Sequence, residues 1–124
     1  MAIQQPGLSN GLCVAAADLS THQFKFVRIT ADFTVNLNSV NNGQCLGILQ
    51  DKPKAGEPAN VMVDGVSKVK LAGNVAFGGL ISSTAAGLGQ AATGVNTVVQ
   101  AMALEAGVLN DIIAVQLIRC VLAS

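Results

Sequence analysis

The chain of 124 residues contains no tryptophan and no tyrosine, a single histidine, and few charged side chains. With only four phenylalanines, it offers little aromatic surface on which nucleic-acid bases could stack. Its seven basic and seven acidic residues cancel, so no net field draws the chain to a polyanion. We therefore expect no nucleic-acid partner.

Charged residues make up 11% of the chain, against about 25% in ordinary soluble domains. The surface must then be covered by neutral side chains, with few charges to keep neighbouring molecules apart. This composition favours a protein that lies against a partner over a neutral secreted-type domain. At this length we expect one domain with one modest core.

Motifs of enzymatic chemistry are missing. His22 is the only histidine, so a catalytic zinc site built from several imidazoles is excluded. No serine stands in G-x-S-x-G context, and the place of His22 beside Thr21 at the start of a predicted strand favours a solvated surface histidine. The glycines at 87 and 89 lack the spacing of a dinucleotide-binding turn. The sequence predicts a protein that is not an enzyme and has no catalytic residue, cofactor or metal site.

Two groups of carboxylates lie close together in the sequence. Asp51 and Glu57 share a loop with two lysines, which is typical of a solvated loop and not of acid-base catalysis. Asp111 could pair with Glu105 across a hairpin, although turn formation at Asn110 and Asp111 is the favoured interpretation.

The cysteines and the apolar runs bear on where the protein is made. Cys13, Cys45 and Cys120 are odd in number, lack C-x-x-C spacing and have apolar neighbours, which indicates reduced, buried thiols of a cytosolic product. No basic residue precedes the short apolar stretch near the N-terminus, which Asp18 interrupts, so we expect no signal peptide. The longest apolar segment, 112–123, is too short to span a membrane.

Short apolar runs separated by turn residues dominate what remains. In the centre, runs at 47–49, 61–63 and 66–71 flank a loop at 51–58 and the dipeptide Asp64 and Gly65. Aspartate followed by glycine between two such runs predicts a tight hairpin, so the centre should be a β-meander. The positions expected to shape it are Gly47, Pro53, Gly56, Pro58, Asp64 and Gly65.

The remaining runs predict further short strands and a mainly β fold, a small antiparallel barrel or sandwich. Residues 84–97 are rich in alanine, glycine and small polar side chains and should form turns and loop, with one helical turn conceivable at 85–92. Residues 38–43 form a loop by composition. The expected strands outside the centre cover 24–29, 33–37, 80–82, 98–104 and 112–122.

The block GILQDKPKAGEPANVMVDGVSKV, residues 47–69, closely resembles the most constant block of a family of tailed-phage capsid decoration proteins. These are also called cement proteins and were formerly listed as a domain family of unknown function. Residues 15–20 and 23–27 look like the family's opening strand, and 103–117 looks like its closing hairpin. The resemblance covers roughly residues 13–117. It implies a β-tulip-like domain, which we expect at 13–124. Residues 1–12 hold a proline, two glycines and two glutamines without a sustained period, which indicates an extended N-terminal arm; a disordered terminus is the alternative.

The resemblance also implies a function. The protein would be made in the host cytoplasm, bind the major capsid protein on the exterior of the virion, and stabilise the phage head by mass action, without contact with membranes. Low charge together with the resemblance predicts self-association as a homotrimer. The arm would contact the capsid as a strap, with these residues as candidates: Ile3, Gln4, Gln5, Pro6, Leu8 and Leu12.

Two alternatives remain open. A small β-barrel carrier domain could be modified at Lys68 in its Val-Ser-Lys-Val context, although such a lysine belongs at a hairpin tip and Lys68 falls in the middle of a predicted strand. An enzyme of unrecognised chemistry is the other.

Overall fold

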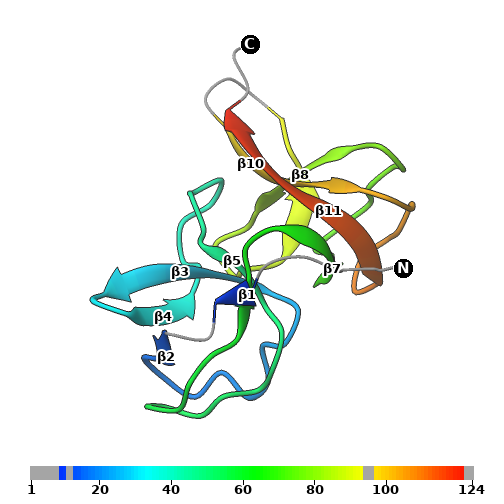
Figure 1. Ribbon diagram of the computed structural model, residues 1–124. Helices are drawn as coiled ribbons and strands as arrows, with labels where there is room; N and C mark the ends of the chain where they lie inside the picture. Colours follow the sequence, from blue (N-terminus) through cyan, green and yellow to red (C-terminus); the bar gives the residue numbers. More distant parts are fainter. Residues whose placement is uncertain (1–8, 11–12, 94–96, 122–124) are drawn as a thin grey trace.

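The computed structural model describes residues 9–10, 13–93 and 97–121. These residues form strands joined by turns, and no helix occurs among them (Figure 1). The mainly β class predicted from the sequence is confirmed. No helix in this part of the chain could therefore be long and apolar enough to cross a membrane. The strands are β1 (Ser9–Asn10), β2 (Val14–Ala15), β3 (Phe26–Ala31), β4 (Thr34–Leu37), β5 (Gly47–Leu49), β6 (Val61–Met62), β7 (Gly65–Lys70), β8 (Leu80–Ser83), β9 (Gly89–Ala91), β10 (Val98–Ala103) and β11 (Ile112–Val121).

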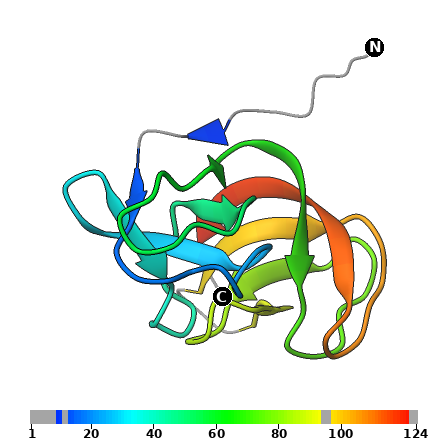
Figure 2. The same cartoon turned by 90° about the horizontal axis from the view of Figure 1, so that it is seen from below.

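The strands form two sheets, and the chain completes one before it enters the other. The first sheet has the order β1-β6-β5-β3-β4-β2, and the second has the order β7-β11-β10-β8-β9. Figure 1 shows the first sheet in blue to green and the second mostly in green to red. All pairings are antiparallel except that of β2 with β4. Figure 2 shows β11 and β10 side by side, with the curvature of the second sheet.

The first sheet wraps round a small core of its own. The segment 56–59, which leads into β6, bonds to β2 at the far side of the sheet. The amide of Ala15 donates to the carbonyl of Glu57 at 2.9 Å, and the amide of Ala59 donates to the carbonyl of Cys13 at 2.9 Å. The wrapped sheet buries a cluster made of Cys13, Ala15, Leu19, Val27, Val35, Leu49, Ala59 and Val61.

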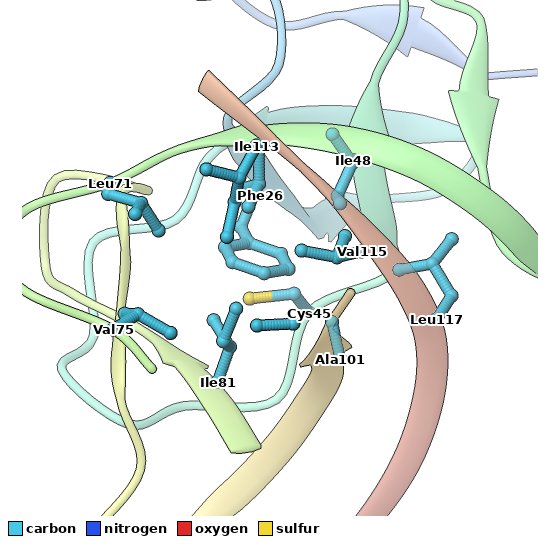
Figure 3. Close-up of a cluster of buried hydrophobic side chains, with 12 residues drawn as sticks. Phe26, Cys45, Ile48, Leu71, Val75, Ile81, Ala101, Ile113, Val115 and Leu117 are labelled. Carbon is cyan, nitrogen blue, oxygen red and sulfur yellow. The ribbon is translucent and has the colours of Figure 1, made fainter. Parts of the chain in front are cut away.

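A second core lies between the two sheets. Phe26 of β3 and Ile48 of β5 are fully buried and meet side chains from β7, β8, β10 and β11 (Figure 3). The labelled side chains in Figure 3, among them Ile81 and Val115, point toward the ring of Phe26. This shared core holds the two sheets together, because burial of apolar surface is the dominant favourable term in folding.

The predicted tight hairpin at Asp64 and Gly65 is wrong. Strand β6 pairs with β5 and β1, whereas β7 pairs with β11, so the dipeptide connects the two sheets. The local chemistry of a turn is present: Gly65 has a φ of 101°, and its amide donates to Oδ1 of Asp64 at 2.9 Å. All six residues of β7 find partners on β11, a longer ladder than the two residues of β6 could offer. The central meander is therefore limited to β5 and β6.

Several other predictions have clear outcomes. Strands occur at the sites predicted for β3, β4, β8, β10 and β11, although β3 begins at Phe26 because Phe24 adopts a φ of 65°. The sequence missed β9 within the stretch 84–97, and no helical turn forms at 85–92. It also missed that β2 is parallel to β4, in an expected all-antiparallel fold.

Candidate interaction surfaces

The face of the second sheet that points away from the core carries a row of neutral, mostly apolar side chains. Val66 lies opposite Gln116 on β11, and Gln116 lies opposite Met102 on β10. Met102 in turn lies opposite Leu80 on β8. The residues that alternate with this row, such as Val115 and Ala101, are buried between the sheets, so the row itself points outward.

The same face continues along β11 with apolar side chains. Ile112, 50% exposed, and Leu104, 51% exposed, occupy outward positions beyond Met102. We call Val66, Leu80, Met102, Leu104 and Ile112 the outer apolar face. Soluble monomers rarely expose large contiguous apolar patches, and such patches usually mark sites of interaction with another molecule.

Two loops at one end of the second sheet add further exposed apolar side chains. The loops are joined by a bridge between Val75 and Gly107, with mutual backbone hydrogen bonds of 2.9 and 3.0 Å. Phe77 on the first loop is 77% exposed, and Val108 and Leu109 on the second are also exposed. Large apolar side chains are usually buried in the folded protein, so these loops are candidates for contact with another protein.

A buried polar network fixes the loop between β4 and β5 to the second sheet. Asn38 is 1% exposed, and its Nδ2 donates to the carbonyl of Val40 (2.8 Å), Oγ of Ser83 (2.7 Å) and the carbonyl of Thr84 (2.9 Å). Gln90 of β9 reaches the same loop, where its Nε2 donates to Oδ1 of Asn42 at 3.0 Å. The network has an evident structural role, because buried amides need partners.

The predicted capsid-binding residues Ile3, Gln4, Gln5, Pro6, Leu8 and Leu12 lie outside the described residues. Next to them, Ser9 and Asn10 form β1, which pairs antiparallel with Met62 and Val61 at the edge of the first sheet.

The residues expected to shape the central block have identifiable local roles. Gly47 is buried where β5 approaches β6, and the carbonyl of buried Pro53 accepts from the amide of Leu19 at 2.9 Å. Gly56 has a φ of 82°, and its amide donates to the carbonyl of Ala15 at 2.8 Å. Pro58 forms a bridge to Val14 beside the wrapped first sheet. Asp64 and Gly65 form the connection between the sheets.

Candidate residues for chemistry are kept apart from one another. Glu105 Oε2 accepts from the amide of Ala114, and Asp111 Oδ2 accepts from the amide of Val108, each at 3.0 Å. Asn110 has a φ of 71°, which confirms the predicted turn there. In the described part of the chain, no group of three or more histidine, cysteine, aspartate or glutamate side chains is placed to hold a metal ion.

Cys13 and Cys45 are buried, as predicted; the side chain of Cys120 lies outside the described set. Lys68 lies within β7, opposite Ala114, and its ammonium is 5.9 Å from the centroid of the Phe24 ring. A carrier lysine would lie at a hairpin tip, whereas Lys68 lies in the middle of a strand.

His22 lies at the surface, half-buried, and contacts a lysine. Its Nδ1 is 3.0 Å from Nζ of Lys25, and because an ammonium group can only donate, Nδ1 is the acceptor. Burial, and then the charge of Lys25, lower the pKa of His22 below its usual value of 6.5. The neutral imidazole therefore suits this position.

No protein-family model matches the chain, and no curated protein matches it. Among solved structures, the fold is similar to that of the N base of the head fiber gp8.5 of bacteriophage phi29. The similarity is one of fold. The TM-score is 0.69, and the match covers 94% of this chain and 97% of that chain, with 12% sequence identity. The resemblance to capsid decoration proteins stays a prediction from the sequence.

Proposed function

We propose that the protein is a structural component of a phage virion that binds the outer surface of the assembled head and stabilises it. The observation that carries the proposal is the fold shared with a phage head-fiber base over nearly the whole of both chains. The central block that resembles decoration proteins supports the same role. The role needs no catalytic residue and no cofactor.

The physical basis of the stabilisation is linkage. A protein that binds the assembled shell and not its dissociated subunits shifts the equilibrium toward the shell by mass action. The partner in this proposal is the major capsid protein. A chain with 11% charged residues suits such a contact, since few charges must be stripped of water when the surfaces meet.

We further propose that the protein acts as a homotrimer, with copies meeting through the outer apolar face. The exposed row across β7, β11, β10 and β8 supports this, because it presents neutral and apolar side chains across four strands. Two charged residues, Lys68 and Lys70, share this side of the sheet and lie on its edge strand β7, opposite Ala114 and Ile112.

Co-sedimentation with heads tests the proposal. Heads that lack the protein are mixed with increasing amounts of purified protein and pelleted. We expect saturable binding, and decorated heads that withstand a higher temperature before they lose their contents. Heads that pellet without the protein at micromolar concentration would rule the function out.

A second candidate is the base of a head fiber, because the structural neighbour is itself the N base of a phage head fiber. In this case the chain would carry a projecting structure and would not need to stabilise the shell. Electron microscopy of decorated heads, together with the melting of the heads, separates the two functions: a projection with unchanged head stability indicates a fiber base.

A further inference from the structure

A surface pocket of about 390 Å³ lies where the segment before β3 meets β7 and the start of β11. Lys25, Lys52 and Lys70 line it, three of the seven basic residues of the chain, and Ser20 and Thr21 add two hydroxyl groups. The backbone holds two of the lysines together: the amide of Lys70 donates to the carbonyl of Phe24, the residue before Lys25, at 3.0 Å. The pocket therefore gathers positive charge from three separate segments of a chain with no net charge.

None of the lining residues is acidic. Two carboxylates neighbour the pocket in sequence without lining it: Asp18 Oδ1 accepts from the amide of the lining residue Ser20 (3.0 Å), and Asp51 Oδ1 accepts from the amide of Asn60 (3.2 Å). Asp111, next to the lining residue Ile112, accepts from the amide of Val108. Each of these carboxylates bonds to a backbone amide, and none lines the pocket that the three lysines share.

The pKa of Lys25 responds to its surroundings in the pocket. Burial, and after it the charge of Lys70, lower the pKa of Lys25 from its usual 10.5. The ammonium group of Lys25 donates a hydrogen bond to Nδ1 of His22, and this neutral partner positions the ammonium group without cancelling its charge. A bound anion would relieve this repulsion, because an opposite charge within a few ångströms favours the charged form of a lysine.

The pocket also has an apolar wall. Phe24 and Ile112 line it together with the lysines, and Ile112 belongs to the outer apolar face as well. An inorganic anion would use the ammonium and hydroxyl groups alone. A peptide would use both parts, with a carboxylate among the lysines and an apolar side chain against the wall.

We propose that the pocket made by Lys25, Lys52 and Lys70 binds an acidic segment of a partner protein, with a carboxylate between the ammonium groups and a neighbouring apolar residue against Phe24 and Ile112. This inference rests on the proposed function, because it takes the partner protein to be the shell protein. It assigns to the shell an exposed acidic peptide where this chain docks.

A pair of synthetic peptides tests the chemistry of the pocket without the shell. Acetyl-Leu-Asp-Asp-Leu-amide and its Leu-Asn-Asn-Leu counterpart are titrated into the full chain, and backbone amide shifts are followed by NMR at low salt. We expect the acidic peptide to shift the amides of residues 20–25, 52 and 70 and the neutral one to leave them in place. Binding should weaken as salt rises toward 0.3 M, since exposed charges are screened.

Lysine-to-glutamine variants locate the binding. Each of Lys25→Gln, Lys52→Gln and Lys70→Gln should weaken binding of the acidic peptide about two- to fivefold, the order expected of one exposed charge contact, and the triple variant about tenfold or more. Lys54→Gln is the matched control, because Lys54 is an exposed lysine of the same loop as Lys52 but does not line the pocket. Melting curves of all variants show that they are folded.

Three outcomes would overturn the inference. The neutral peptide could bind as well as the acidic one, or Lys54→Gln could lose as much affinity as the pocket variants. Inorganic phosphate could also shift the same amides at a lower concentration than the peptide, which would indicate a site for small anions.

Heads separate this inference from the proposed function. If the wild-type protein pellets with heads and the triple variant pellets equally well, the shell does not use the pocket and only this inference fails. If the wild-type protein binds the acidic peptide but not heads, the proposed function fails and the preference of the pocket for acidic peptides is supported.

Discussion

Gly47 is the residue at which the backbone tolerates least change. A Cβ built at this position would lie 2.1 Å from the carbonyl oxygen of Met62 on β6. Replacement by alanine must therefore push β5 and β6 apart inside the wrapped first sheet. We expect Gly47→Ala to lower the free energy of unfolding by roughly 2–4 kcal/mol, as overpacking of a rigid site does.

Urea unfolding followed by circular dichroism measures the effect, since the chain has no tryptophan or tyrosine to report by fluorescence. Gly73→Ala is the control, because its Cβ would meet no atom within 4 Å, and it should change stability by less than about 0.5 kcal/mol. Equal free energies of unfolding for the two variants would show that β5 and β6 can move apart without loss of stability.

His22 should make stability depend on pH in the weakly acidic range. Its pKa is lower in the folded protein than the usual 6.5, so the unfolded state binds more protons in acid. The free energy of unfolding therefore falls as the pH drops through 6.5, and this loss is complete below the folded pKa. Of the charged groups that act on His22, Lys25 opposes its protonation and Asp18 favours it.

His22→Gln removes the titration and keeps an oxygen that can accept from Lys25. We expect the melting temperature of this variant to fall less between pH 7.5 and pH 5.0 than that of the wild type. The window stays above the titration of Asp18, whose pKa is lowered from 3.8 by its hydrogen bonds to Ser20. Parallel curves for the two proteins would contradict the assignment.

At the scale of elements, the loop between β4 and β5 depends on Asn38. Removing this buried side chain takes a donor from the hydroxyl of Ser83 and from the carbonyl of Thr84, which keeps its bond from Ser83 Oγ. It also takes the acceptor Oδ1 from the amide of Val40. Asn38→Ala should lower the free energy of unfolding by about 2–3 kcal/mol, the order of a buried polar group left unsatisfied. Asn74→Ala, at an exposed site, should stay within about 0.5 kcal/mol.

Hydrogen exchange adds a readout specific to the network. The amide of Asn42 donates to the carbonyl of Ser83 at 2.8 Å and should exchange faster in Asn38→Ala than in the wild type. Unchanged protection of Asn42 would show that other bonds hold the loop.

The elements also show what sequence reasoning could reach. Runs in which apolar and polar residues alternate, such as 33–37, predict their strands, because alternation indicates a strand with one face buried. The partner of a strand is set by distant residues: nothing near Gly65 reveals that β7 pairs with β11 and not with β6. Strand β9 has the sequence Gly-Gln-Ala, with no apolar pattern, and is held by backbone bonds to β8 and by the amide of Gln90.

The candidate surfaces were partly within reach of the sequence. Met102 and Ile112 fall on the outward positions of strands whose inward positions are also apolar, and a strand apolar on both sides needs a second covering layer. The lysine pocket was out of reach, because Lys25, Lys52 and Lys70 meet only when the segment before β3 lies against β7.

At the scale of the whole molecule, self-association should depend on the outer apolar face. Met102 lies near the centre of that face, in register with Leu80 and Gln116. Met102→Asp buries a charge in any interface between copies and should convert the proposed trimer to a monomer in sedimentation velocity at micromolar concentration. The melting of the monomer should stay close to that of a control, Thr30→Asp, which adds the same charge to an exposed site on the first sheet.

A wild-type protein that is already monomeric, both free and on heads, would remove the trimer and leave head binding untouched. A Met102→Asp variant that remains trimeric would move the interface to another surface, such as the loops that carry Phe77 and Leu109.

The arm gives the whole-molecule test of how the chain holds a head. Residues 9–10 of the arm form β1, which pairs with β6, so a deletion of 1–12 would remove this pairing as well, whereas a deletion of 1–8 removes the larger part of the arm and keeps β1. Ordering a strap costs roughly 1–2 kcal/mol of backbone entropy per residue, so it helps only if most of its length is engaged, with Ile3 and Leu8 as apolar anchors.

We expect the deletion of 1–8 to leave the melting curve nearly unchanged and to weaken binding to heads about tenfold, or about 1.4 kcal/mol. Co-sedimentation of the truncated and full-length chains over a range of concentrations measures the difference. If both decorate heads at the same concentration, the arm does not contribute to binding. The contact must then be made by the folded domain, and the triple lysine variant in the truncated chain would show whether the pocket beside β7 supplies it.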